Sequence, residues 1–288
     1  MIAQILISGV TLGAVYALIA IGFTIVFATK RIINFAHGEF VMLGGVLAVY
    51  LSQTIGLPMP IAILLTLACV ALGAALLYLA ILDQQSGDPL SQIMITLGLA
   101  IAIKGLVQVT IGKGTLFLSP LSAVTHWSAF GLYLNPQAVW IVCALVIFVM
   151  ALAAVFRATW LGLSMRAVAL NPYAAVLMGV VPKWVAASAF VIAGLFGAAA
   201  GVLLAPIASA SYDNGLFLGL KGFGAAVLGG LGSPLGAVAG GLLLGLAESI
   251  SAGYISSAYK DAITLSLLLL VLMFFPQGLL GGRNLTKL

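Results

Sequence analysis

The chain has 288 residues, of which 64% are apolar and only 6% are charged. A soluble domain carries about 25% charged residues because its surface faces water, so this composition excludes an ordinary soluble protein. The net charge of +5 comes from residues spread singly between apolar segments, which excludes the clustered basic surface of a nucleic-acid-binding protein.

A helix that crosses a bilayer needs about 20 predominantly apolar residues. Runs of this kind follow one another along the whole chain, at residues 4–28, 38–55, 60–82, 91–112, 136–156, 184–206 and 262–282. Residues 217–252 are apolar but rich in glycine, and we expect two close-packed helices hinged at Ser233–Pro234. The sequence therefore predicts an all-α integral membrane protein, a polytopic bundle of about eight or nine segments that forms one domain over residues 1–288.

The densest polar cluster is Asn34-Phe35-Ala36-His37-Gly38-Glu39, between the first two runs. One interpretation is a structural turn, in which Asn34 caps the next helix and Glu39 favours its N-terminal dipole. The other is that Asn34, His37 and Glu39 line a pathway or gate, because buried polar groups are costly in a membrane unless they are paired or wet. The two interpretations are compatible.

Two residue types inside apolar runs need an interpretation. Lys104 lies within the fourth run, where an ionisable residue is by default a functional hypothesis. Its stem could snorkel outward, its ammonium could pair with Asp213 or Asp261, or it could attract an anionic solute. Cys69 and Cys143 are expected to be small buried hydrophobes rather than a disulfide or a metal site.

Glycine is concentrated toward the end of the chain. The spacings 236/240 and 241/245 are those of a helix-packing groove, and packing is the default interpretation. A glycine-lined solute path that includes Gly229, Gly230 and Gly232 is the alternative. Glu248, which follows this stretch, is expected to face the bundle interior or the outer interface.

Basic residues predict the orientation of the chain. Three groups fall on one side of the membrane when 217–252 crosses twice: Lys30 and Arg31; Arg157, Arg166 and Lys183; Arg283 and Lys287. The positive-inside rule makes that side the cytoplasm and places the N-terminus outside.

Two connections are longer than a tight turn. Residues 113–135 are expected outside, as a periplasmic loop. Residues 157–183, inside, are amphipathic rather than spanning, so they either lie in the headgroups or face a cytoplasmic partner. Composition alone does not separate these alternatives.

The sequence contains no catalytic motif, namely no His-Glu-x-x-His pair, Gly-x-Ser-x-Gly elbow or Cys-x-x-Cys. It also lacks a Gly-x-x-x-x-Gly-Lys-Ser/Thr loop for phosphate. We therefore expect a protein that is not an enzyme and has no metal or cofactor site of its own. If it transports a solute at the expense of ATP, the ATPase is another chain.

Taken together, these segments resemble the permease subunits of branched-chain amino acid ABC importers, in particular the shorter of the two paired permeases. The similar blocks keep family order over almost the whole chain, and the more specific ones are INFAHGEFVMLGG (33–45), WLGLSMRAVALNPYAAVLMGV (160–180) and GLKGFGAAVLGGLGSPLGAVAGGLLLGLAES (219–249).

The resemblance implies a bacterial inner-membrane subunit with several partners: a second homologous permease, two cytoplasmic ATP-binding subunits that hold ATP and magnesium, and an external solute-binding protein. It implies alternating access, with 157–183 as the segment that couples to the ATPase and Arg166, Asn171 and Ala174 near the contact.

Two departures from the family pattern bear on the substrate, namely DQQSGDPL (83–90) in place of a basic loop and Lys104 in place of an uncharged residue. An amino acid is the first expectation, and urea, an amide or a small aromatic carboxylate is the alternative. A stand-alone secondary transporter or channel is less favoured, because it needs mid-membrane acids that this chain mostly lacks.

Overall fold

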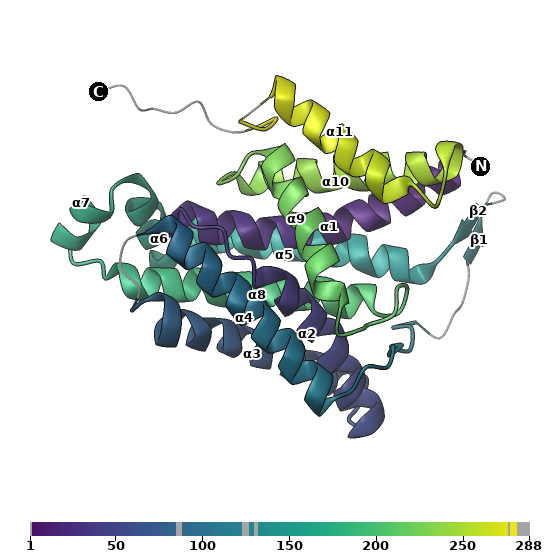
Figure 1. Cartoon of the computed structure of the whole chain (residues 1–288), viewed down its shortest axis with the longest axis horizontal. Coiled ribbons are helices and arrows are strands. Elements are labelled where there is room, and N and C mark those ends of the chain that lie inside the picture. The colour runs from purple at the N-terminus through teal and green to yellow at the C-terminus, as the bar shows by residue number, and fades with distance from the viewer. Residues whose placement is uncertain (1, 85–87, 123–126, 130–131, 276, 281–288) are drawn as a thin grey trace.

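The structure is a computed structural model that describes residues 2–84, 88–122, 127–129, 132–275 and 277–280, and these form a helical bundle with one small hairpin (Figure 1). The elements up to the hairpin are α1 (Ile2–Lys30), α2 (His37–Val49), η1 (Tyr50–Thr54), α3 (Met59–Leu77), η2 (Tyr78–Leu82), α4 (Pro89–Thr110), β1 (Trp127–Ala129) and β2 (Leu132–Leu134). The remaining elements are α5 (Pro136–Ala158), α6 (Trp160–Leu170), α7 (Pro172–Leu177), α8 (Pro182–Leu204), α9 (Asn214–Gly229), α10 (Pro234–Ile250), η3 (Ser251–Ile255) and α11 (Lys260–Phe274). The three η elements are π-helical turns.

The predicted membrane segments coincide with helices. Among the described residues, six helices are long and apolar enough to cross a membrane: α1, α3 with η2, α4, α5, α8, and α10 with η3. The expected count of about eight or nine is reached by adding α2 with η1, α9 and α11, which are shorter. Residues 217–252 do form two helices, α9 and α10, on either side of the predicted hinge.

Two details differ from expectation. The last helix ends at Phe274 rather than near residue 282. Phe275 leaves the helical region with ψ 72, as expected for a residue that precedes proline in the sequence. The 113–135 connection contains the antiparallel pair β1–β2, with three residues in each strand, which the sequence did not predict.

Helix α1 is the centre of the bundle. The run from Ala14 to Ile21 is at most 3% exposed, and α1 packs against α5, α8, α9 and α10. On α10, Gly241 faces Ala17 and Gly245 faces Gly13, with no space for a side chain at either glycine. These contacts confirm that the small-residue spacing serves close helix packing.

The prediction that both cysteines are buried is wrong. Cys69 on α3 and Cys143 on α5 are free and exposed. An apolar run does not imply burial within the protein here, because the lipid-facing surface of a membrane helix is as apolar as its packed face.

The two ends of the bundle carry different elements. In Figure 1 the N-terminus and the β1–β2 hairpin lie at one end, and α6 and α7 project at the other. Lys30 and Lys183 lie together at the second end: Lys30 stacks over the ring of Tyr78, and Tyr78 donates to Asp83, the partner of Lys183. Arg283 and Lys287, which also entered the orientation argument, lie outside the described residues.

Candidate solute pathway and coupling surface

The polar cluster at 34–39 lies deep inside the bundle because the chain turns back after α1. Arg31 adopts a left-handed backbone with φ 57, and residues 32–36 are not helical. His37 then reaches the carbonyl of Ile19, eleven residues before the end of α1, or about 16 Å along a helix. Irregular backbone at membrane depth is tolerated only where protein buries it or where it borders water.

The first polar side chain of this stretch supports the turn itself. Asn34 is 2% exposed, and its Oδ1 accepts from the backbone N–H of Ala36 at 3.1 Å. The N-cap of α2 is Ala36, without a side-chain cap. The prediction that Asn34 caps the helix is therefore wrong in detail, because its hydrogen bond closes the turn that precedes the helix.

The imidazole of His37 is sealed between helices. The side chain is 0% exposed, and its Nε2 lies 3.0 Å from the carbonyl oxygen of Ile19. Its ring meets Phe23 edge-on at 4.7 Å and occupies the space beside Gly22. Nδ1 has no hydrogen-bond partner among the described residues, so the ring retains one free polar atom in the core.

Glu39 stands in the first turn of α2, as expected, and its carboxylate packs against the start of α9. It is 3% exposed, and a Cβ added to Gly215 would come within 2.5–2.7 Å of its carboxyl atoms. Oε2 has no partner among the described residues.

Lys104 does not pair with either of the predicted acids. Its ammonium lies 5.4 Å from the centre of the Tyr212 ring, and no ion pair joins it to another described residue. Asp213 instead accepts from Ser211 at 2.6 Å, and Asp261 pairs with a different lysine. The contact that Lys104 makes is therefore with an aromatic ring rather than with an acid.

The glycines at 229–232 form the turn between α9 and α10. Gly230 and Gly232 have φ values of 102 and 96, a backbone that side chains disfavour. Gly229 packs against the backbone of Gly236. The N–H groups of Leu279 and Leu280 donate to the carbonyls of Leu228 and Gly229 at 2.8 and 3.0 Å. These glycines therefore build a tight turn, and their part in a solute path stays a prediction.

The predicted coupling segment protrudes from one end of the bundle as α6 and α7 (Figure 1). Arg166, Asn171 and Ala174 are all exposed, and the Asn171 side chain caps α7 by accepting from the N–H of Ala174 at 3.0 Å. Beside them stand large apolar side chains with high exposure: Leu170 86%, Tyr173 86%, Leu177 88% and Met178 85%.

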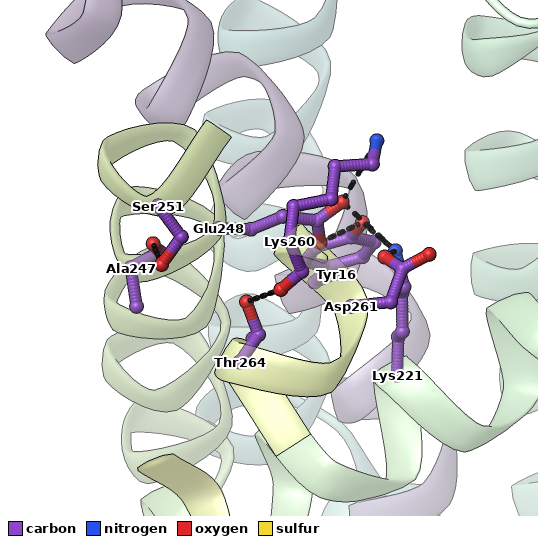
Figure 2. Close-up of polar contacts among 8 residues, drawn as sticks. All are labelled: Tyr16, Lys221, Ala247, Glu248, Ser251, Lys260, Asp261 and Thr264. Carbon is purple, nitrogen blue, oxygen red and sulfur yellow. Dashed lines mark hydrogen bonds and ion pairs between the residues drawn. The ribbon is translucent and has the colours of Figure 1, made fainter. Parts of the chain in front are cut away.

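A network of charged residues that the sequence did not predict connects α1, α9, α10 and α11 (Figure 2). We call Tyr16, Lys221, Glu248, Lys260 and Asp261 the Glu248 network. Glu248 is 1% exposed, and it accepts from the Tyr16 hydroxyl at 2.7 Å and from Lys221 at 2.8 Å. Lys260 lies 3.3 Å from the same carboxylate, and Lys221 also reaches Asp261 at 2.7 Å.

Sequence reasoning considered members of this network separately. It expected Glu248 to face the bundle interior or the outer interface, and the burial of Glu248 supports the first of these alternatives. The ionisable residues in and beside the apolar runs could have indicated that such a network exists, because charged groups in a membrane pair with opposite charges. The choice of partner was not available, because Tyr16 and Glu248 are 232 residues apart in sequence.

The comparisons with known proteins agree with this architecture. Residues 5–272 match the family described as "Branched-chain amino acid transport system / permease component". The high-affinity branched-chain amino acid transport system permease protein LivH of Escherichia coli (strain K12) is 34% identical, with 99% of this chain and 97% of that protein covered. The corresponding protein BraD of Pseudomonas aeruginosa is 33% identical with the same coverage.

A more distant relative and a solved structure extend the similarity. A probable branched-chain amino acid transport permease protein LivH of Methanocaldococcus jannaschii is 24% identical over 92% of this chain and 88% of its own length. Among solved structures, PsaBC from Streptococcus pneumoniae in complex with Fab aligns with a TM-score of 0.52 and 12% identity, covering 94% of this chain and 90% of that chain. At this identity the solved structure shows a shared fold only.

Proposed function

The chain belongs to the family of branched-chain amino acid transport permeases, and we propose that it forms the translocation pathway of an ATP-binding-cassette importer for branched-chain or related amino acids. It is a multi-pass protein of the inner membrane. The observation that carries the proposal is similarity at 33–34% identity over 99% of the chain to two proteins named as such permeases.

ATP hydrolysis is assigned to other subunits, because the 288 residues contain no phosphate-binding loop. In the proposed assembly, two cytoplasmic ATP-binding subunits bind ATP and magnesium, and this chain needs no cofactor of its own. A second homologous permease pairs with it in the membrane, and a solute-binding protein delivers the solute from outside. ATP drives alternating access by binding more tightly to one conformation than to the other.

The exposed surface of α6 and α7 supports the coupling role that we assign to Arg166, Asn171 and Ala174. Large apolar side chains on a short, protruding helix favour contact with another protein over contact with water. Pro172 and the Asn171 cap fix the start of α7, so that a push on this helix is transmitted to α6 and α8, which flank it.

The pathway role that we assign to Asn34, His37 and Glu39 rests on buried polar atoms that have no partner among the described residues. Such atoms in a membrane interior are costly, and they mark the place where a second conformation can admit water or solute. We add Lys104 because it is a half-buried cation inside a membrane helix that forms no ion pair with another described residue. The turn at Gly229, Gly230 and Gly232 connects α9, which covers Glu39, to α10. We therefore assign this part of the bundle to a gate, with α9 as the element that moves.

Reconstitution tests the proposed function directly. The chain would be placed in proteoliposomes together with its second permease and the ATP-binding subunits. ATP would be supplied on the side of the membrane that carries the ATP-binding subunits. The solute-binding protein and labelled leucine would be supplied on the opposite side. We expect leucine uptake that requires ATP and every subunit. The matched control is the same assembly with an ATP-binding subunit whose phosphate-loop lysine is replaced.

Uptake of leucine by this chain alone, without ATP, would contradict the proposal and support a stand-alone transporter. Uptake of urea, an amide or a small aromatic carboxylate in place of leucine would support the assignment as an importer but contradict the assignment of the substrate. Binding of these solutes by the isolated solute-binding protein gives an independent measure of the same choice.

A further inference from the structure

The Glu248 network extends from the core of the bundle to its surface. The exposed fraction of the side chain rises from 1% at Glu248 to 18% at Lys221, 37% at Lys260 and 57% at Asp261. The Glu248 network therefore has a buried inner end at Glu248 and an exposed outer end at Asp261. His37 and Glu39, by contrast, are buried on all sides, at 0% and 3% exposed. The outer end at Asp261 is therefore accessible from outside the bundle without a rearrangement of the core.

The buried end of the network lies within the depth of the membrane helices. Tyr16 stands at the middle of α1, which is 29 residues long. Glu248 is seven residues from the end of the span Pro234–Ile255, or about 10 Å along a helix. Charged side chains at such depth face the bundle interior, a partner or a water-filled cavity rather than lipid. Because Lys221 joins Glu248 directly to Asp261, the same rule argues that the face of Lys260 and Asp261 borders water or protein rather than lipid.

The chemistry of the network matches the main chain of an amino acid. Two ammonium groups and two carboxylates alternate, and Lys221 bridges Glu248 and Asp261. A zwitterion carries one carboxylate and one ammonium group, so it exchanges with the outer ion pair without leaving a charge unpaired. An anion or a cation alone leaves one network residue without a partner of opposite charge, so the network favours a solute that carries both charges.

We infer that the Lys221–Asp261 end of the Glu248 network borders the aqueous pathway and binds the α-carboxylate and α-ammonium groups of a zwitterionic amino acid. Lys221 and Lys260 receive the carboxylate, and Asp261 receives the ammonium group. Glu248 and Tyr16 do not contact the solute, but they hold Lys221 in place from the buried side. This inference rests on the proposed function and adds to it a site and a mode of recognition.

Thiol accessibility tests the inference while every network residue is retained. Ala262 is exposed and follows Asp261 on α11, so Ala262→Cys serves as the reporter in a chain with Cys69→Ala and Cys143→Ala. Ile147→Cys on α5, 63% exposed on an apolar helix surface, is the lipid-facing control. We expect a charged, membrane-impermeant methanethiosulfonate to modify Ala262→Cys about tenfold faster than Ile147→Cys or more, because thiolates form in water.

Ligand protection then tests recognition of the zwitterion. Leucine at millimolar concentration should slow the modification of Ala262→Cys in the assembled complex. Neither 4-methylpentanoate, which lacks the ammonium group, nor 3-methylbutylamine, which lacks the carboxylate, should do so. Adding Asp261→Asn should abolish protection. Asp88→Asn, which alters an exposed carboxylate at the cap of α4, should leave protection intact.

Equal modification rates at Ala262→Cys and Ile147→Cys in a complex that elutes as a single species would overturn the inference, whatever solute the complex carries. Fast modification without protection in a complex that imports leucine would also overturn it, while the proposed function would stand. Equal protection by leucine and by both single-charge analogues would indicate binding of the shared aliphatic chain and would overturn the zwitterion assignment. If the wild-type complex fails to import leucine, the proposed function fails, and protection by leucine alone still decides the inference.

Discussion

At the residue scale, the few charged side chains of this bundle fall into two environments. Glu39 is enclosed between α2 and α9, with an oxygen that lacks a partner among the described residues. The ion pair between Lys183 and Asp83 joins the start of α8 to the residue that follows η2, and the two side chains are 44% and 18% exposed. A charge enclosed within the membrane, as at Glu39, costs free energy and therefore indicates function. A partly exposed ion pair such as Lys183–Asp83 contributes modestly to stability.

The Lys183–Asp83 pair predicts a dependence of stability on pH. The hydrogen bond from Lys183 Nζ lowers the pKa of Asp83 below its usual range. A lowered folded-state pKa contributes stability that is present above the unfolded pKa of about 3.9 and is lost as the pH falls through the folded value. We expect Lys183→Gln to cost about 0.2–1 kcal/mol at neutral pH, as for other exposed pairs, and to cost nothing at sufficiently low pH.

Thermal unfolding in detergent across this pH range measures the effect. Lys113→Gln is the matched control, because Lys113 is exposed and forms no ion pair with any described residue. A difference between Lys183→Gln and the wild type that stays constant down to the lowest pH would contradict the assignment.

At the scale of elements, glycines set how closely the helices approach. At the α2–α8 contact, Gly201 lies against the carbonyl of Val41 and Gly44 lies against the backbone of Ala198. Both contacts involve backbone atoms, which cannot move aside as a flexible side chain can. Close approach of this kind is how membrane helices gain packing energy where lipid removes the hydrophobic driving force.

Gly201→Ala should therefore destabilise the bundle. A Cβ at this position has no room against the Val41 carbonyl, and the resulting overpacking costs about 1–3 kcal/mol. The matched control is Gly73→Ala on α3, where an added Cβ meets nothing within 4 Å and alanine is the better helix former by about 1 kcal/mol. Unfolding in a denaturing detergent compares the two, and equal stability would contradict the packing argument.

Helix α7 gives a second prediction at this scale. Asn171→Ala removes the side-chain acceptor for the N–H of Ala174, and the loss of a helix cap costs about 1 kcal/mol. If α7 transmits motion from the ATPase, ATP-dependent uptake should fall while the level of folded protein in the membrane is retained. Asn171→Asp keeps a capping oxygen and should restore uptake, and unchanged uptake in both variants would contradict the coupling role.

At the scale of the whole molecule, the bundle has two chemically distinct ends. The N-terminus and the β1–β2 hairpin lie at one, and α6 and α7 lie at the other (Figure 1). Lys183 begins α8 directly after α7, and Lys30 ends α1 close to it, since both lysines contact the Tyr78–Asp83 pair. The positive-inside rule places this second end in the cytoplasm, where the proposed ATP-binding subunits are located.

Cysteine labelling from each side of the membrane tests this orientation. In a chain with both native cysteines replaced by alanine, Tyr173→Cys on α7 should react with an impermeant thiol reagent only from the cytoplasmic side. Phe117→Cys, which is 62% exposed in the 113–135 connection, should react only from the outside. Labelling of the two positions from the same side would contradict the predicted topology.

Composition and run length were enough to predict that this chain lies in a membrane and where its helices are. Apolar composition and run length report on the solvent and on segment length, so each predicted segment corresponds to a helix, including α9 and α10. The resemblance also identified the family, because its motifs are local in the sequence.

The contacts between residues far apart in the chain could not be predicted and came from the folded structure. Lys221 joins Glu248 and Asp261, Lys104 lies over the ring of Tyr212 rather than beside an acid, and Cys69 and Cys143 are exposed rather than buried. The physical reason is that lipid is as apolar as a packed helix surface, so hydrophobic pattern does not distinguish an inward face from an outward one. Partners far apart in the chain are fixed by helix packing, and the depth at which α2 begins depends on the backbone turn at Arg31.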